Sequence, residues 1–221
     1  TYNKTLGIRR LGSICSSIGS DPECFIVDKN NKMIPSFRFL PSKEDKFVGP
    51  ESDQAIFWDG FQAEFNISAS SCLDGRTHST SQGLADLLKL AQKYDKDAIL
   101  SIQTTFDIEQ ETLNTENPEH VAFGCMPSFN IYGLEGIKAD GKDVPFRSAG
   151  GHIHFGIADY LNGTKSENEI LVGRIVKSLD AILGVACVSL FDKYDDVRRR
   201  SMYGLAGEYR LPLHGLEYRT L

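Results

Sequence analysis

Residues 150–156 have the sequence Gly-Gly-His-Ile-His-Phe-Gly, a short segment bounded by glycines that predicts a β-strand. Side chains alternate between the two faces of a strand, so residues two positions apart point the same way. His152 and His154 are therefore expected to share one face. Taken alone, such a pair is as typical of an ordinary half-buried strand as of a metal site.

Three further segments repeat this spacing of polar residues in strand-like surroundings. Taken singly, they are typical of a solvated turn or of a cross-strand ion pair on a surface. On strands of one sheet they would bring several carboxylates, two imidazoles and at least two guanidinium groups to one concave face. The pairs are Asp21 and Glu23, Glu208 and Arg210, and Glu217 and Arg219.

Such a face predicts a bound cation and a bound phosphate. Clustered carboxylates raise one another's pKa values unless a cation neutralises them. Mg²⁺ favours a few carboxylates together with substrate phosphates. Arginine matches phosphoryl oxygens at fixed charge. The combination is typical of a phosphoryl-transfer site. Asp59 and Glu64 lie five positions apart across a predicted turn, so the strand period does not decide their facing.

The remaining pattern predicts an α+β fold in a single domain, residues 1–221, with a curved, mostly antiparallel sheet and helices on its convex face. Apolar spacing predicts helices at residues 81–94 and 166–191, the second opened by a capping box of Ser166 and Glu169. The acidic stretch 107–119 is predicted to be a surface loop. Strands are predicted at residues 24–27, 208–211 and 217–219, and on both sides of an Asp59-Gly60 turn.

Composition narrows the class of protein. The net charge of −6 argues against binding to nucleic acid, which requires an excess of basic residues on the binding surface. No apolar stretch approaches the ~20 residues of a membrane helix. The five cysteines form no CxxC pair, which favours reduced thiols in the cytoplasm. The chain starts without methionine and stops directly after its last motif, as expected of a chain trimmed at its ends, above all at the C-terminus.

The ordered set of motifs resembles two related groups of enzymes. Asp-Pro-Glu-Cys-Phe at residues 21–25, Gly-His-Ile-His at 151–154 and Gly-Leu-Glu-Tyr-Arg at 215–219 are similar to three strands of glutamine synthetases. The closer resemblance is to the phage-associated, phiEco32-like COOH-NH2 ligases of type 2. That family has a Gly-x-Asp-Pro-Glu start, a Gly-Gly-His-Ile-His-x-Gly strand and a Tyr-Gly…Tyr-Arg…Glu-Tyr-Arg ending. These appear here at residues 19–23, 150–156, 203–204, 209–210 and 217–219.

The resemblance implies roles for individual residues. It places one Mg²⁺ or Mn²⁺ ion on Glu23 and Glu64, and a second ion, which bridges the ATP phosphates, on Asp21, His152 and Glu217. Asp21 stands where glutamine synthetases have Glu, a shorter reach that shifts the ion. The residues implied to contact nucleotide, transferred phosphoryl group or substrate are Arg210, Arg219, Arg200 and His154.

The implied activity is ATP-dependent ligation of a carboxylate to an amine through an acyl phosphate. The substrates would be amino acids or peptides, in the host-cell cytoplasm if the protein is phage-encoded, and a homo-oligomer is left open. The general base is not identified by sequence.

Two alternatives remain: a non-catalytic virion or binding protein that keeps the fold, and a metal-dependent amidohydrolase. The amidohydrolase would need repeated βα units, which the sequence lacks, and further histidines, of which only His78, His120 and His214 remain. The chain has no GxxxxGK[ST] motif, which argues against a P-loop kinase.

Overall fold

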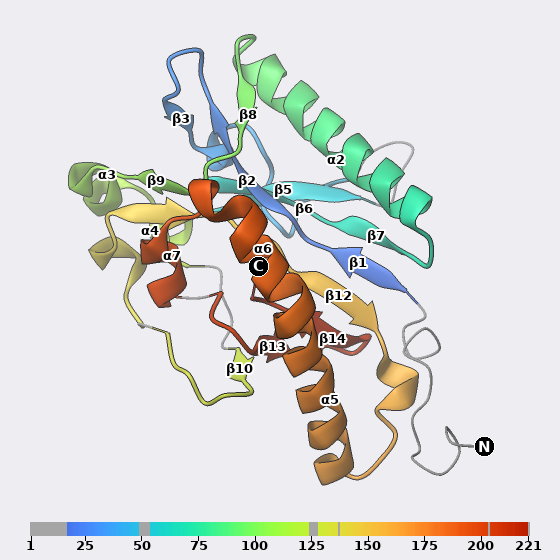
Figure 1. Cartoon of the computed structure of the whole chain (residues 1–221). Helices are drawn as coiled ribbons and strands as arrows, with labels where there is room; N and C mark the ends of the chain where they lie inside the picture. Colours follow the sequence, from blue (N-terminus) through green and yellow to red (C-terminus); the bar gives the residue numbers. More distant parts are fainter. Residues whose placement is uncertain (1–16, 49–53, 124–127, 137, 203, 221) are drawn as a thin grey trace.

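The computed structural model describes residues 17–48, 54–123, 128–136, 138–202 and 204–220. They form an α+β fold with two larger antiparallel sheets and one short strand pair (Figure 1). The first sheet has six strands. In spatial order they are β10 (Phe129–Asn130), β13 (Glu208–Arg210), β14 (Gly215–Tyr218), β12 (Ile153–Gly156), β1 (Ile18–Ser20) and β7 (Ile67–Ser70).

The second sheet also pairs its strands antiparallel, and β8 (Ile99–Ser101) joins it by pairing with β2. A separate pair consists of β9 (Thr105–Asp107) and β11 (Phe146–Ser148). The strands of the second sheet are, in spatial order, β3 (Met33–Ile34), β2 (Glu23–Val27), β6 (Gln62–Phe65), β5 (Ala55–Asp59) and β4 (Phe47–Val48).

The two larger sheets meet where the chain passes from β1 to β2 and from β6 to β7. Asp21 and Pro22 make the first passage, and Asn66 makes the second. The backbone N–H of Glu23 donates to the carbonyl of Gly150 at 2.9 Å, and that of Phe65 donates to the carbonyl of Pro22 at 3.1 Å. These bonds fix the start of β2 against the segment that leads into β12.

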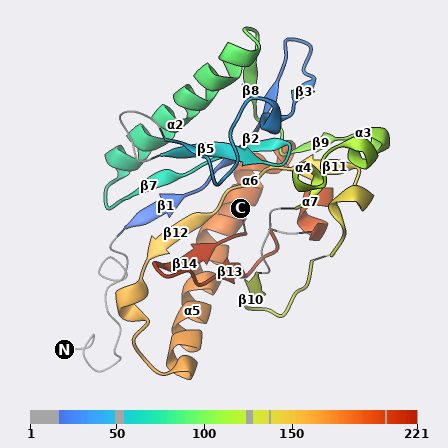
Figure 2. The ribbon, with the colours of Figure 1, turned by 180° about the vertical axis from the view of Figure 1, so that it is seen from behind.

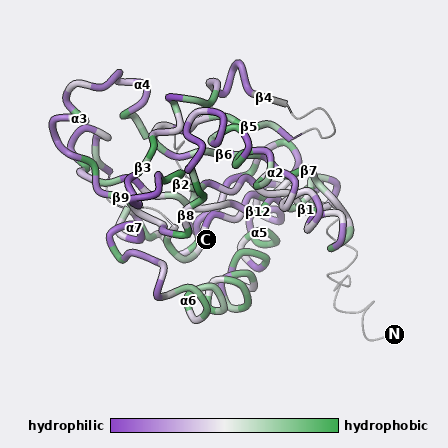
Figure 3. Tube along the Cα trace, turned by 90° about the horizontal axis from the view of Figure 1, so that it is seen from above, coloured by the Kyte–Doolittle hydropathy of each residue, from purple (hydrophilic) through white to green (hydrophobic). Residues whose placement is uncertain are grey.

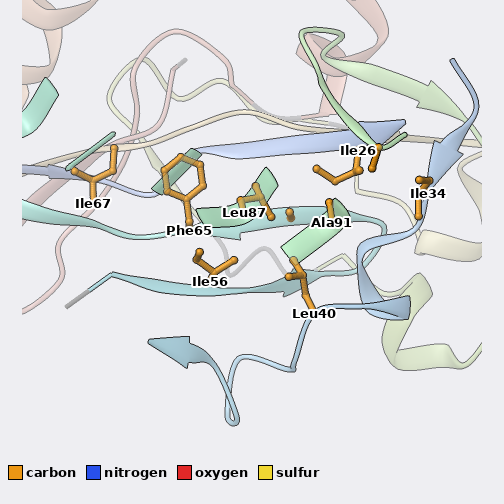
Figure 4. Close-up of a cluster of buried hydrophobic side chains, with 10 residues drawn as sticks. Ile26, Ile34, Leu40, Ile56, Phe65, Ile67, Leu87 and Ala91 are labelled. Atoms are coloured by element: carbon orange, nitrogen blue, oxygen red, sulfur yellow. The ribbon is translucent and has the colours of Figure 1, made fainter. Parts of the chain in front are cut away.

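One helix covers the second sheet. Helix α2 (Leu73–Tyr94) buries Leu87 and Ala91 against residues of β2, β5 and β6. Phe65 and Ile56 are fully buried there, and Figure 4 shows both beside Leu87. Since Phe65 and its neighbour Glu64 point to opposite faces of β6, Glu64 is directed away from α2.

The first sheet is covered in the same way by α5 (Lys165–Leu179), which lies behind β12 and β14 when the molecule is viewed as in Figure 2. Val172 and Val176 pack against Leu216 and Tyr218, which are completely buried. Glu217 lies between these two residues and therefore faces the side of the sheet opposite α5. The predicted α+β fold with antiparallel strands is confirmed, but the strands form two larger sheets, each covered by its own helix, rather than one curved sheet.

Helix α5 is followed without a break by a π-helical segment (Asp180–Gly184) and by α6 (Val185–Phe191). The capping box is formed by Thr164 and Glu167, so the predicted Ser166–Glu169 box was wrong by two residues. Both boxes satisfy the same Ser/Thr-x-x-Glu pattern, and only the register of the first turn distinguishes them. Likewise, α2 begins at Leu73, eight residues before the predicted start.

The predicted surface loop at residues 107–119 was also wrong. This stretch contains α3 (Gln110–Thr115) and part of α4 (Pro118–Val121). Leu113 and Val121 are buried and form a small core with Phe61 and Ile108, which anchors the acidic segment.

Short 3₁₀ helices and α7 complete the described elements: Ser36–Arg38, Gly141–Asp143, Ala158–Tyr160, Asp192–Tyr194 and α7 (Val197–Met202).

Among the described residues no helix combines the length and the apolar character needed to cross a membrane. Hydrophobic colour is visible along α6 (Figure 3), and Ile182, Val185 and Leu190 in this region are exposed. The described strand pairs are antiparallel, which contradicts the parallel βα barrel that the amidohydrolase alternative would require.

Candidate functional site

A cleft of about 620 Å³ lies along the junction of the two sheets, on the faces turned away from α2 and α5. The register of strand pairing in the first sheet determines which residues form the floor of the cleft. Gly19 is paired with His154, His154 with Glu217, and Glu217 with Arg210. Cross-strand partners share a face, so this row of four residues runs across the sheet beneath the cleft.

Three carboxylates from the second sheet form a group at one end of the cleft. Glu23 and Glu64 are direct cross-strand partners on β2 and β6, and Asp59 ends the neighbouring strand β5. One oxygen of each of these three lies within 4.8 Å of the others, as expected of a metal site. Burial, followed by the charge of Asp59, raises the pKa of Glu23 to about 8. Burial raises the pKa of Glu64 to about 8 as well, although Lys43 opposes the shift.

A second group, Asp21, His152 and Glu217, lies within the same distance limit of 4.8 Å. The His152 Nδ1 atom is 3.2 Å from Asp21 Oδ1 and 3.5 Å from Glu217 Oε1. The backbone N–H of His152 also donates to Asp21 Oδ1 at 3.0 Å. Burial opposes ionisation of Asp21, but hydrogen bonds with His152 and His154 outweigh it and hold the pKa of Asp21 far below its ordinary value.

Two arginines contact the carboxylate of Glu217. Arg210 Nη2 is 2.9 Å from Glu217 Oε1, and Arg219 Nη1 binds the same oxygen. Arg219 is almost completely buried, whereas the side chain of Arg210 is 26% exposed in the cleft. Burial raises the pKa of Glu217, and the charge of Arg210 works against that shift. Arg210 is therefore the arginine that an incoming anion reaches first.

Two histidines also line the cleft, His154 from the row and His214 beside it. His154 Nε2 is 3.2 Å from Asp21 Oδ2, and His154 Nδ1 is 2.9 Å from His214 Nε2. His214 occupies the turn between β13 and β14, where its carbonyl accepts the N–H groups of Ile157 and Ala158. Burial and the nearby His154 lower the pKa of His214.

The structure brings most of the residues singled out in the sequence into this one cleft. His152 lies directly before β12 and Arg219 directly after β14, but both keep the expected facing. Tyr203 lies outside the described residues. The predicted residues that line the cleft are Asp21, Glu23, Glu64, His152, His154, Arg210, Glu217 and Arg219.

Arg200 and Glu208 are not in the cleft, and for them the structure corrects the expectation. Arg200 lies on α7, where its Nε binds Asp195, and it lines a separate hollow beside α6. Glu208 is buried and accepts the N–H of Gly204 at 2.8 Å. Its carboxylate therefore stabilises the turn before β13. The two-residue spacing from Arg210 in the sequence does not predict this role.

Sequence reasoning gave no role to Lys43 or His214 and left Asp59 undecided. Lys43 Nζ lies 4.0 Å from Glu64 Oε1 and its side chain is 68% exposed. Asp59 pairs with Gln62, so the two central turn residues are Gly60 and Phe61, and Asp59 shares a face with Glu64. Gly60 has a positive φ of 63°, a conformation that favours glycine. The glycine could therefore have indicated in the sequence that Gly60 is a central turn residue.

The donor sets fit divalent cations. The group of Glu23, Asp59 and Glu64 offers oxygen atoms alone, which Mg²⁺ and Mn²⁺ prefer, and the second group adds one imidazole. The raised pKa values of Glu23 and Glu64 show that burial leaves these carboxyls without enough positive charge from the protein. A divalent cation would supply that charge.

Comparison with known proteins gives a match to the model described as phage phiEco32-like COOH.NH2 ligase-type 2, over residues 136–221. No curated protein and no solved structure matches the chain. The matched segment contains His152, His154, Arg210, Glu217 and Arg219, whereas the three-carboxylate group lies before it. Over residues 136–221, the chain is therefore similar to the phage phiEco32-like COOH.NH2 ligase-type 2 family.

Proposed function

We propose that this protein is an ATP-dependent carboxylate–amine ligase that forms an amide bond through an acyl phosphate. The observation that carries the proposal is the joint placement of two candidate metal groups and two arginines in one cleft. A phosphoryl group in transfer carries charge that cations and arginines stabilise. The family description supports ligation of a carboxylate and an amine.

In this proposal each group has a separate task. Glu23, Asp59 and Glu64 hold one Mg²⁺ or Mn²⁺, and Asp21, His152 and Glu217 hold the other. Bound cations would neutralise the phosphates of ATP and polarise the transferred phosphoryl group.

Arg210 grips the phosphoryl oxygens directly from the cleft wall, because its side chain is partly exposed. Arg219 binds Glu217 from the buried side and keeps that carboxylate in place. His154 lies on the cleft floor between Asp21 and His214 and faces the substrates.

ADP release tests the proposal. The protein is incubated with Mg-ATP and an array of amino acids and dipeptides as carboxylates, each with hydroxylamine or with a second amino acid as the nucleophile. We expect at least one carboxylate to give ADP together with a hydroxamate, because hydroxylamine traps acyl phosphates. Tight Zn²⁺ binding without nucleotide binding, or ATP binding without any product across the array, would point to the alternatives and reject the ligase.

Metal binding gives a test that does not depend on the substrates. Mg²⁺ with ATP should raise the melting temperature by mass action, by an amount that grows with ligand concentration. Glu64→Gln and Glu217→Gln should each reduce this shift because they remove a charged ligand. Glu167→Gln, at the exposed capping box of α5, is the matched control and should leave the shift unchanged. An undiminished shift in both cleft variants would exclude them as ligands.

The stability of the cation-free protein should fall as the pH rises from about 4.5 to about 8. Over this interval Glu23 and Glu64 keep their protons in the folded state but lose them in the unfolded chain, so unfolding releases protons and high pH favours it. The lowered pKa of Asp21 does not offset this, since its contribution is lost only in stronger acid.

Mg²⁺ should reverse the trend, because only ionised carboxylates bind it. Thermal unfolding across this pH range, with and without Mg²⁺, is the measurement, and stability that rises with pH in the absence of cation would contradict the expectation.

A further inference from the structure

Amide formation needs a base, and part of the cleft is not used by the candidate metal groups or the arginines. An amine arrives as an ammonium ion at neutral pH and has no lone pair with which to attack. The cleft carboxylates of Asp21 and Glu217 are already bound by imidazole and guanidinium groups. Arginine does not give up its proton in this range. Outside the two candidate metal groups and the arginines, the titratable residues that line the cleft are Lys43, His154 and His214.

Hydrogen bonding distinguishes the two histidines. Both ring nitrogens of His154 are engaged, Nε2 by Asp21 Oδ2 at 3.2 Å and Nδ1 by His214 Nε2 at 2.9 Å. Asp21 is an ionised acceptor, so His154 Nε2 must be the donor in the neutral ring, and its Nδ1 is then an acceptor. His214 Nε2 consequently donates to it. This chain of bonds leaves the lone pair on Nδ1 of His214.

The position of His214 suits contact with an incoming molecule. It lies in the turn between β13 and β14, and its ring lines the cleft while the residue as a whole is exposed. The turn backbone is fixed by two hydrogen bonds to the segment after β12. Lys43 lies instead beside Glu64, in the half of the cleft that contains the three carboxylates. His214 is therefore an exposed imidazole of the cleft that an incoming amine can reach.

We propose that His214 is the general base that deprotonates the amine substrate, with His154 and Asp21 as positioning residues that fix its tautomer. The inference rests on the proposed ligase function. Nδ1 of His214 takes one proton from the ammonium group. The nitrogen lone pair then forms the C–N bond, and the bond between the acyl carbon and the phosphate oxygen breaks. The departing phosphate keeps that electron pair and takes the second proton of the amine.

Charged groups around His214 support this role. His154 on β12 and Asp21 after β1 are the titratable groups that act on its ring. Burial is the main cause that lowers the pKa of His214, and the charge of Asp21 works against it. A base with a lowered pKa is unprotonated at neutral pH and thus ready to accept. Protonation of His214 strengthens its hydrogen bond to His154, and through it the bond to the Asp21 carboxylate.

Comparison of two nucleophiles tests the proposal. Hydroxylamine is largely uncharged at neutral pH and needs no base before it attacks, whereas the amino acids of the array carry an ammonium group. His214→Gln should lower amide formation with amino acids about 100-fold or more. It should leave hydroxamate formation with the same carboxylate close to the wild-type rate. The wild-type rate with amino acids should rise with pH through the pKa of His214, and the variant should lose this limb of the profile.

His78→Gln is the matched control, because His78 is exposed on α2, outside the cleft, and should behave as the wild type. If His214→Gln keeps both activities, or loses both equally, His214 is not the base. A wild type that forms neither product rejects the ligase function itself, and the assignment of the base falls with it.

A spectroscopic measurement checks the tautomer without any substrate. Long-range ¹H–¹⁵N NMR spectra should show His214 protonated at Nε2 and unprotonated at Nδ1 near neutral pH. His154→Ala should convert this signal into a mixture of tautomers, since the acceptor of the Nε2 proton is gone. A wild-type His214 that carries its proton on Nδ1 would contradict the proposal regardless of activity.

Discussion

Arg219→Ala is expected to lower the free energy of unfolding by about 3–5 kcal/mol, the usual cost of removing one partner of a buried ion pair. Only 2% of the Arg219 side chain and 7% of the Glu217 side chain are exposed. Without Arg219 the Glu217 carboxylate keeps Arg210 on its cleft side but loses its partner on the buried side. Urea unfolding monitored by circular dichroism measures the change.

Arg198→Ala serves as the comparison. Arg198 forms ion pairs with Asp107 and Asp196 at 2.7 Å, but its side chain is 46% exposed. Exposed pairs contribute about 0–1 kcal/mol, so this variant should remain close to the wild type. Equal losses in the two variants would mean that burial of the Arg219–Glu217 pair has no special cost.

Arg210→Lys is expected to reduce turnover with the best carboxylate and amine by about 100- to 1000-fold, the loss that follows removal of one preorganised donor to a developing charge. A planar guanidinium holds two phosphoryl oxygens, whereas an ammonium group is a point charge. Because lysine keeps the positive charge at this position, binding of Mg-ATP should change much less than turnover. Steady-state kinetics and separate calorimetry of nucleotide binding distinguish the two effects.

The position of the arginine is the reason for expecting a change in turnover rather than in fold. Arg210 is partly exposed, and its Nη2 reaches Glu217 from the cleft side. If Arg210→Lys retained full turnover, Arg210 would be only a cross-strand partner of Glu217, as its register on β13 and β14 also permits.

Much of the cleft could be predicted because it depends on the alternation of side chains along strands. A spacing of two residues is enough to place His152 with His154, and Glu217 with Arg219, on common faces. Spacing does not say which strands become neighbours. The pairing of β14 with β12 and of β12 with β1 joins segments far apart in the chain. Burial of Leu216 and Tyr218 under α5 favours the place of β14 in the sheet, but spacing in the sequence does not reveal it.

The predictions that were wrong or undecided depend on interactions that the alternation of side chains along a strand does not determine. A shift of one residue in a hairpin moves every side chain to the other face, so the place of Asp59 depended on whether residues 59–60 or 60–61 form the turn. Glu208 and Arg210 have the same spacing as the pairs that line the cleft, but the carboxylate of Glu208 accepts a hydrogen bond from the backbone of Gly204 instead. The acidic segment at residues 107–119 contains helices because Leu113 and Val121 are buried in a small hydrophobic core.

The passage from β1 to β2 has a mechanical consequence. Asp21 belongs to one candidate metal group and Glu23 to the other, with Pro22 alone between them. Two residues of chain span at most about 7 Å, and proline removes most of the freedom of the backbone at that point. The chain therefore limits how far the two candidate metal groups can move apart, and the second connection at Asn66 ties the same two sheets.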